Sequence, residues 1–112
     1  MVARRVRAAD NRDELLALFP RSPNAFHVSA FWNRLGKLHR MGHRLRDARR
    51  LEPHRAASLR MLPSLDARAL CNTAHGLACA NLGSKPPWGH FWREIERCAL
   101  LQCDSYEDQN VA

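Results

Sequence analysis

The sequence predicts an all-α protein of stacked helical hairpins, an α-solenoid fragment of about two repeats and the start of a third. Two stretches carry apolar residues at intervals of three and four, which places them on one helix face. These residues are Val28, Phe31, Trp32, Leu35 and Leu38 in the first stretch, and Ala67, Leu70, Cys71, Ala74, Leu77 and Ala78 in the second. Adding 39 to the first five numbers gives five of the second set, and Asn33 falls on Asn72. This shared phase indicates a repeat, although two unrelated amphipathic helices could also share it.

A short helix precedes the first stretch. Its sequence is DELLALF, Asp10 or Asn11 can cap its N-terminus, and Pro20 ends it. After a turn over residues 21–25, the first long helix runs over residues 27–40.

A basic connection and a shorter helix follow. Residues 41–43, Met-Gly-His, break the long helix, and residues 44–52 form the connection. A proline suits the first turn of the next helix, which we expect over about residues 54–62 with Ala57 and Met61 facing inward.

Residues 65–101 predict one complete hairpin. Gly83 can end its first helix in a left-handed conformation, and prolines at 86 and 87 prevent the helix from resuming. The second helix carries its apolar face on Trp88, Phe91, Trp92, Ile95, Cys98 and Ala99. We expect the three tryptophans of the chain to lie in the core. A turn is expected over residues 102–105, after which residues 106–112, YEDQNVA, match LDARALC at a shift of 41.

The predicted organisation is a basic arm followed by one helical-repeat domain over residues 11–112. Its parts are the arm (1–10), a leading helix and turn (11–25), repeat 1 (26–64), repeat 2 (65–105) and a truncated repeat 3 (106–112). Periods of 39 and 41 residues are typical of stacked helical hairpins. On this interpretation the chain is a fragment or the N-terminal part of a longer array. The acid-free start, MVARRVRAA, is either a simple basic arm or the beginning of an organelle-targeting peptide.

Composition and charge narrow the class of partner. The 112 residues suffice for one small domain, and a 46% hydrophobic content argues against general disorder. No apolar run approaches the roughly 20 residues needed to span a bilayer, and no secretory signal is present, so we expect an intracellular protein without a membrane partner. Net charge is +7, with 14 Lys+Arg against 5 Asp+Glu in residues 1–60 and 4 against 6 in residues 61–112. Sixteen of the eighteen basic residues are Arg, which favours a nucleic-acid partner. A GC-rich coding sequence would also raise the Arg/Lys ratio, but it explains the charge asymmetry less well.

The second stretch resembles the octotricopeptide-type repeats, and related arrays occur in FAST-kinase-domain-containing, RAP-domain and RNA-editing substrate-binding complex proteins. The resemblance rests on LDARALCNTAH (residues 65–75) and recurs in YEDQNVA at the end of the chain. Residues 27–38 are similar to the first helix of such arrays, DELLALF is similar to their leading helix, and the likeness covers about residues 11–112. It implies an α-solenoid that binds single-stranded RNA in a mitochondrion or plastid and acts in RNA processing, stability or translation, with protein partners of an RNA-processing complex.

Two features depart from the family pattern. Where the family often has Trp-Ala, this chain has His75-Gly76, and glycine inside a helix is about 1 kcal/mol less favourable than alanine. The connection over residues 44–52 is also longer than usual.

RNA contacts are expected on the polar face of the first helix of each repeat. Helical-repeat proteins read bases with two or three side chains per repeat, and Arg or Lys hold phosphate. The open faces are expected to show Ser29, Asn33, Gly36, Lys37 and Arg40, and Arg68, Asn72, His75, Gly76 and Cys79. The predicted RNA-binding residues are Asn33, Arg34, Lys37, Arg40, Arg44, Arg68, Asn72 and His75. The alternative is that these are only solvated polar positions.

A basic run gives a second candidate for RNA binding, an edge that follows the phosphates. Its residues are Arg40, Arg44, Arg46, Arg49, Arg50 and Arg55. The alternative is a solvated loop.

The same sequence features leave other function classes open. A protein-interaction scaffold of the same architecture is the leading alternative. A zinc module would use Cys71, His75, Cys79, Cys98 and Cys103, but the tight cysteine pairs of structural zinc sites are absent. We therefore expect no metal or other cofactor, and buried thiols in a reducing compartment. No catalytic constellation or phosphate-binding glycine loop stands out, so neither an enzyme nor a small-molecule substrate is expected.

Overall fold

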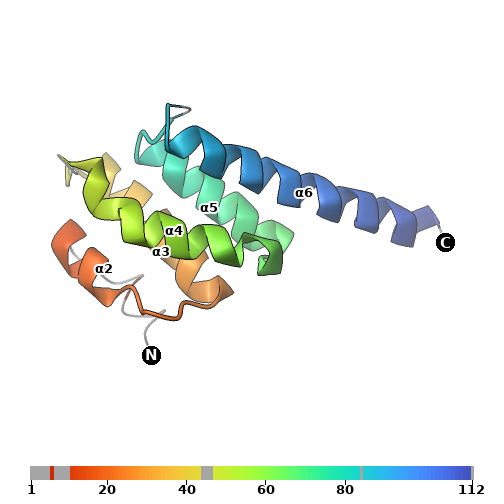
Figure 1. Cartoon of the computed structure of the whole chain (residues 1–112), viewed down its shortest axis with the longest axis horizontal. Helices are drawn as coiled ribbons and strands as arrows, with labels where there is room; N and C mark the ends of the chain where they lie inside the picture. Colours follow the sequence, from red (N-terminus) through yellow and green to blue (C-terminus); the bar gives the residue numbers. More distant parts are fainter. Residues whose placement is uncertain (1–5, 7–10, 44–46, 84, 112) are drawn as a thin grey trace.

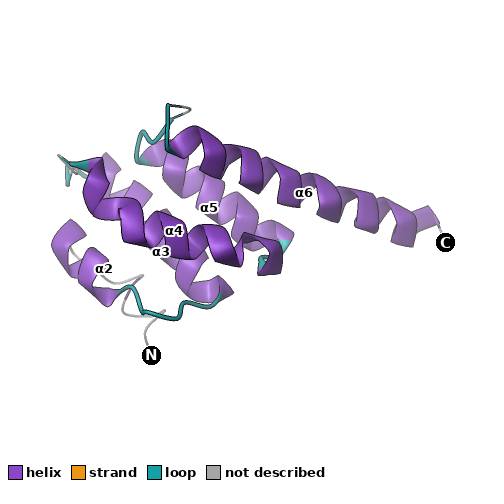
Figure 2. Ribbon diagram, viewed as in Figure 1, coloured by secondary structure: helices purple, strands orange, loops and turns teal. Residues whose placement is uncertain are grey.

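The computed structural model describes residues 6, 11–43, 47–83 and 85–111. Every regular element among these residues is a helix and none is a strand (Figures 1 and 2), so the all-α prediction is confirmed. The elements are α2 (Arg12–Leu18), α3 (Ala25–Arg40), η1 (Ala48–Leu51), α4 (Glu52–Met61), η2 (Leu62–Ser64), α5 (Ala67–Cys79) and α6 (Trp88–Val111), where η marks a 3-10 helix. The boundaries predicted for α2, α3 and α4 agree with these within two residues.

Side-chain caps explain where the helices begin. Asn11, rather than Asp10, caps α2, because its Oδ1 accepts the Glu14 amide at 2.8 Å. Asn24 and His27 form a reciprocal capping box at the start of α3, with N–H···acceptor distances of 2.9 and 3.1 Å. Asp66 caps α5 by accepting the Ala69 amide at 2.8 Å. These caps satisfy backbone donors that would otherwise lack a partner.

Left-handed residues end α3 and α5. Gly42 has φ 99°, and the His43 amide donates to the Leu38 carbonyl at 2.9 Å, as in a Schellman motif. At the end of α5 the left-handed residue is Asn81, with φ 59°, and not Gly83 as expected. Asparagine tolerates this conformation better than most residues, so the helix stops two residues earlier than a glycine-based rule places it.

The long helices alternate in direction along the chain (Figure 1). α3 and α5 run parallel and side by side, because residues of both N-terminal halves line one groove and residues near both C-terminal ends line a small cavity of about 30 Å³. α6 runs antiparallel to α5. Trp92 Nε1 donates to the Leu82 carbonyl at 2.8 Å near the end of α5, and Gln102 Nε2 donates to the Leu65 carbonyl near its start.

No turn interrupts α6 at residues 102–105, so that prediction is wrong. The helix continues to Val111 because no glycine or proline follows Gly89 in the sequence. The start of the truncated third repeat at residue 106 therefore coincides with no break in the helix.

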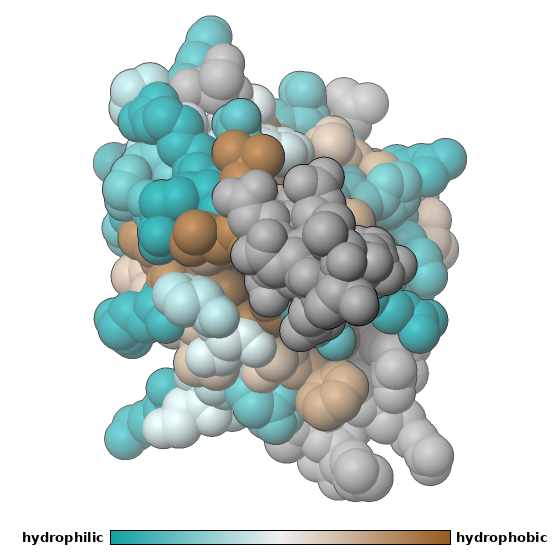
Figure 3. Space-filling view, turned by 90° about the vertical axis from the view of Figure 1, so that its right-hand side faces the viewer, coloured by the Kyte–Doolittle hydropathy of each residue, from teal (hydrophilic) through white to brown (hydrophobic). Residues whose placement is uncertain are grey.

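The surface contains four large hydrophobic side chains that are mostly exposed among the described residues, Phe26, Met41, Leu100 and Leu101. On the end of the molecule seen in Figure 3, a group of hydrophobic side chains lies left of the centre, and hydrophilic side chains lie along the left and upper edges. In the part of the chain that the structure describes, no helix combines the length and apolar character needed to cross a membrane.

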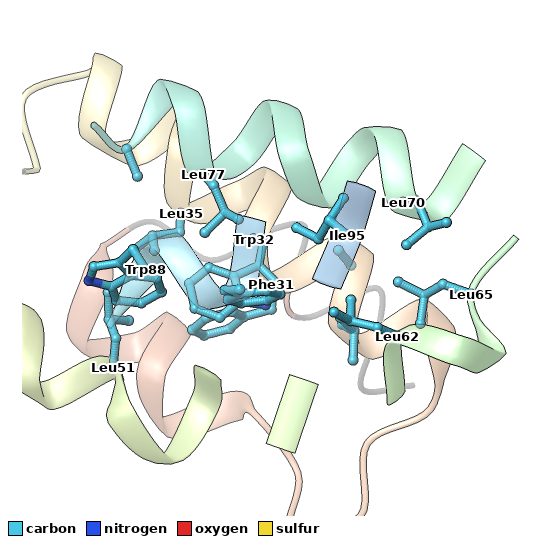
Figure 4. Packing of buried hydrophobic residues seen from close by; sticks show 14 of the residues in the cluster. Phe31, Trp32, Leu35, Leu51, Leu62, Leu65, Leu70, Leu77, Trp88 and Ile95 are labelled. Carbon is cyan, nitrogen blue, oxygen red and sulfur yellow. The ribbon is translucent and has the colours of Figure 1, made fainter. Parts of the chain in front are cut away.

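The core is centred on the aromatic residues of α3 (Figure 4). Phe31 and Trp32 are fully buried and meet edge to face, with ring centroids 4.9 Å apart. Trp32 also packs against Trp88 and Phe91 of α6, at centroid distances of 5.7 and 5.5 Å. Its indole N–H donates to the buried Ser58 hydroxyl of α4 at 2.8 Å. The prediction of core tryptophans is confirmed for Trp32 and Trp88, whereas Trp92 is half-buried.

The buried face of α5 differs from the predicted stripe. Leu70 and Leu77 are buried as expected, but Ala67, Cys71 and Ala78 are exposed. Thr73 and Gly76 are buried in their place. The Thr73 hydroxyl can be buried because it donates to the Ala69 carbonyl at 2.8 Å, one turn earlier on the helix.

The expectation of buried thiols holds only in part. Cys98 is buried, Cys79 is half-buried, and Cys71 is exposed, all three as free thiols. The side chain of Cys103 lies outside the described part of the chain.

Candidate functional site

Two glycines bring α3 and α5 into backbone contact. A Cβ added to Gly76 would lie 2.0 Å from the Trp32 carbonyl oxygen and 2.7 Å from the Asn33 nitrogen. A Cβ added to Gly36 would lie 2.7 Å from the Gly76 carbonyl oxygen. Gly76 therefore does not belong to the open polar face, where the sequence placed it. Gly36 is also buried, and the two glycines fix the separation of the helices at this level.

A groove of about 620 Å³ opens between the N-terminal halves of the same two helices. Its lining residues are Ala25, Phe26, Ser29, Ala30 and Asn33 on the α3 side, and Ser64, Asp66, Arg68, Ala69 and Asn72 on the α5 side. The alanines leave room between the helices, while amide, hydroxyl and charged groups supply hydrogen-bonding capacity. This volume is in the range of about 300–1,000 Å³ that small-molecule sites occupy.

The groove brings together three of the predicted RNA-binding residues. Asn33 and Asn72, which the repeat shift aligns, face one space from neighbouring helices, and both are half-buried. Arg68 lines the same groove and is exposed. The carboxylate of Asp66, also in the lining, already accepts the Ala69 amide at the N-terminus of α5.

The remaining predicted residues lie along the two helices beyond the groove. Lys37 and Arg40 are exposed, at positions i+4 and i+7 from Asn33, so they follow it along one face of α3. Arg34 is half-buried on α3. His75 is exposed on α5, and its Nε2 lies 3.5 Å from the Sγ of Cys79. Arg44 lies outside the described residues.

Sequence reasoning missed Phe26. This side chain lines the groove and is 75% exposed, on the first turn of α3. Its position on the helix could have identified it, because Phe26 lies outside the apolar stripe that begins at Val28. A large aromatic residue that is out of phase with a buried stripe points into solvent or toward a partner.

Three of the six arginines in the second candidate, the basic run, form ion pairs. Arg49 Nε lies 3.1 Å from an Asp47 oxygen, and this hydrogen bond holds the pKa of the Asp47 carboxyl below its usual value. Arg50 pairs with Asp13 of α2 at 3.1 Å. The described residues Arg49, Arg50 and Arg55 thus all have carboxylate partners, and Arg44 and Arg46 lie outside the described part of the chain.

The partner of Arg55 is Glu52, one turn earlier on α4, and the Nε–Oε2 distance is 3.0 Å. The hydrogen bond from Arg55 lowers the pKa of the Glu52 carboxyl. A phosphate at this edge would compete with these carboxylates for the arginine side chains.

The cysteines and histidines do not gather into a metal site within the described residues, where no group of three or more His, Cys, Asp or Glu side chains is placed to hold a metal ion. Cys98 lies in the core on α6, whereas Cys71 is exposed on α5. His75 and Cys79 lie one turn apart on α5 and supply two side chains of types that bind metal ions.

Comparisons with models of protein families, with curated proteins and with solved structures found no match.

Proposed function

We propose that this protein binds single-stranded RNA on the face formed by α3 and α5, without enzymatic activity. The observation that carries the proposal is the placement of Asn33 and Asn72 in one groove between two parallel helices. The repeat shift of 39 aligns these two residues, and the packing of α3 against α5 brings them to the same groove. Arg68 at the groove, with Lys37 and Arg40 further along α3, supplies positive charge beside it.

The chemistry of these side chains suits a flexible, single-stranded ligand. Each asparagine amide offers donors and an acceptor that match the edges of unpaired bases. The three cations would hold phosphates and set the register without reading sequence. Three such contacts on a single strand give a salt slope of about −2, a loss of affinity of about 20-fold between 50 and 200 mM salt.

We also propose that the domain is a fragment of an α-solenoid. The antiparallel hairpins α3–α4 and α5–α6, with the first helices parallel and in contact, are consistent with stacked repeats. The octotricopeptide-type resemblance supports the same architecture. On that basis the protein acts in RNA processing, stability or translation in a mitochondrion or plastid.

The test is the affinity for a labelled single-stranded oligouridine, measured by fluorescence anisotropy at low and high salt. We expect the triple variant Lys37→Glu, Arg40→Glu, Arg68→Glu to bind at least about 20-fold more weakly at low salt and to lose most of its salt dependence. The matched control is Arg60→Glu, Lys85→Glu, Arg93→Glu, which changes net charge equally at exposed positions outside the groove.

Two outcomes would contradict the proposal. If the wild-type protein shows no salt-sensitive affinity for the RNA, RNA binding is wrong. If both triple variants lose the same affinity, the RNA responds to net charge and not to the α3–α5 face.

A protein-interaction scaffold remains the second candidate, and one observation favours it. Leu100 and Leu101 on α6 are 58% and 57% exposed, so two adjacent apolar side chains are accessible to a protein partner. A scaffold would retain its protein partner at high salt, would lose it on Leu100→Gln, Leu101→Gln, and would show no affinity for RNA.

A further inference from the structure

We propose that Phe26 is a stacking platform for one nucleobase at the mouth of the α3–α5 groove. This inference rests on the RNA-binding function proposed above and deepens it. The base would lie against the Phe26 ring, with the Asn33 and Asn72 amides further inside the groove and Arg68 at its rim.

Phe26 differs from the other aromatic residues of α3. Phe31 and Trp32 are fully buried and in ring contact with their neighbours, whereas Phe26 is 75% exposed and has no ring partner among the described residues. An exposed phenylalanine contributes little to the core, because most of its apolar surface stays in water. Its π-face is available to a ligand, and every base has a face to offer it.

The backbone turn that carries Phe26 is fixed by a cap at the start of α3. Phe26 lies on the first turn of α3, between the two residues of the Asn24–His27 capping box. Capping fixes a helix end that would otherwise fray. The ring is therefore presented from an ordered turn, which reduces the conformational entropy that base binding would have to overcome.

The groove next to Phe26 has the shape and polarity for a nucleotide. Ala30 and Ala69 are among its lining residues, and their small side chains leave its middle open. Asn33 lies seven residues after Phe26 on the same helix face, about 10 Å along the axis. This distance allows one base to stack on the Phe26 ring while the next base, or the sugar, lies near the Asn33 and Asn72 amides.

The charges around the groove also favour one orientation of the strand. Asp66, whose Oδ1 accepts the Ala69 amide at the first turn of α5, keeps its negative charge and would repel a phosphate on its side of the groove. Arg68, two residues later and exposed, offers a guanidinium that can hold a phosphate bidentately. The backbone of the strand is therefore expected at Arg68, with the base turned toward α3.

The experiment compares two labelled probes on the full chain, an oligouridine and an abasic ribose-phosphate oligomer of equal length. The variants are Phe26→Ala, Phe26→Tyr and the control Met41→Ala, another exposed apolar residue, just after the C-terminal end of α3. We expect Phe26→Ala to bind oligouridine about 5- to 150-fold more weakly, the range for loss of one base–aromatic stack. Phe26→Tyr and Met41→Ala should retain affinity, and the abasic oligomer should bind all four proteins alike.

Each alternative outcome has a separate meaning. Wild-type affinity of Phe26→Ala for oligouridine would overturn the stacking role and leave RNA binding standing. Equal losses for both probes would also overturn it, because a stack cannot form with an abasic strand. Absence of oligouridine binding by the wild-type protein would overturn both proposals. Because Phe26 is exposed, the variants should keep the wild-type circular dichroism spectrum and unfolding midpoint.

Discussion

Replacing Gly76 by alanine should destabilise the protein even though alanine is the better helix former. The new Cβ would lie 2.0 Å from the Trp32 carbonyl oxygen and 2.3 Å from its carbon. Real Cβ atoms essentially never lie within 3.0 Å of such atoms, so α3 and α5 must part by about 1 Å. The atoms in the way are backbone, and no rotamer change can move them aside.

The size of the effect follows from two opposing contributions. Overpacking a core by one methyl typically destabilises by about 1–3 kcal/mol and occasionally by more. The fixed backbone contact places this site at the upper end of that range. Alanine returns about 1 kcal/mol through helix propensity. The expected net loss in the free energy of unfolding is therefore about 2 kcal/mol, a fall of about 1 M in the urea midpoint for a typical small domain.

Urea unfolding followed by circular dichroism measures this loss, and two other glycines calibrate it. At Gly36 the added Cβ would meet the Gly76 oxygen at 2.7 Å and the Cys79 Cβ at 2.8 Å, a milder overlap. At Gly83 it would meet nothing within 4 Å. The expected order of destabilisation is Gly76→Ala, then Gly36→Ala, with Gly83→Ala near wild type. If Gly76→Ala were as stable as Gly83→Ala, the backbone contact between α3 and α5 would be refuted.

Two further predictions concern buried polar groups. Ser58→Ala removes the acceptor of the Trp32 indole N–H and leaves that buried donor unpaired. We expect the free energy of unfolding in urea to fall by about 1–3 kcal/mol. The control Ser22→Ala, at an exposed position, should stay within about 0.5 kcal/mol of wild type. Burial lowers the pKa of the His54 imidazole below its ordinary 6.5, against the opposing effect of the hydrogen bond between its Nε2 and the Leu16 carbonyl at 3.1 Å, while its Nδ1 is buried without a partner among the described residues. The unfolded chain therefore binds the His54 proton more readily, and stability should rise with pH from the lowered pKa up to about 6.5 and level off above it. His54→Phe should flatten this part of a pH series of unfolding midpoints, and an unchanged slope would show that His54 is not its source.

The elements of the first hairpin could be predicted because their signals were strong and local. In α3, large residues such as Phe31 and Leu35 mark one face without ambiguity, and Gly42 marks the end. The leading helix also had a cap and a proline at its boundaries. Such signals act within a few residues, so tertiary packing had little opportunity to override them.

The face of α5 could not be predicted equally well because its residues are small. Four of the six residues in the predicted stripe are alanine or cysteine, which occur both inside and outside. Thr73 lies outside the predicted stripe, yet it is fully buried because its hydroxyl donates to the Ala69 carbonyl of the same helix. Gly76 is predicted on the open polar face, whereas its lack of a side chain allows the backbone of α5 to contact the backbone of α3.

The sequence aligned two residues of the groove with each other but did not predict the groove. The repeat shift aligned Asn33 with Asn72, and the parallel packing of α3 and α5 places both in one groove. The groove itself depends on the angle and separation of two helices, which no local pattern encodes. The ion pair of Arg50 with Asp13 joins residues distant in sequence, so the basic run looked freer than it is.

Gly76 stands where the octotricopeptide-type pattern that this helix resembles often has alanine, and the packing of α3 against α5 explains why alanine does not fit here. A tryptophan-alanine pair at residues 75–76 would place a methyl group against the Trp32 carbonyl, where there is no space for one. The repeat shift of 39 aligns the asparagines, but the contacting glycines are 40 residues apart. The helices therefore touch at Gly36 and Gly76, while the groove opens between their N-terminal halves. The glycine that is unfavourable for α5 as an isolated helix thus fixes how far apart α3 and α5 lie, and with it the space between Asn33 and Asn72.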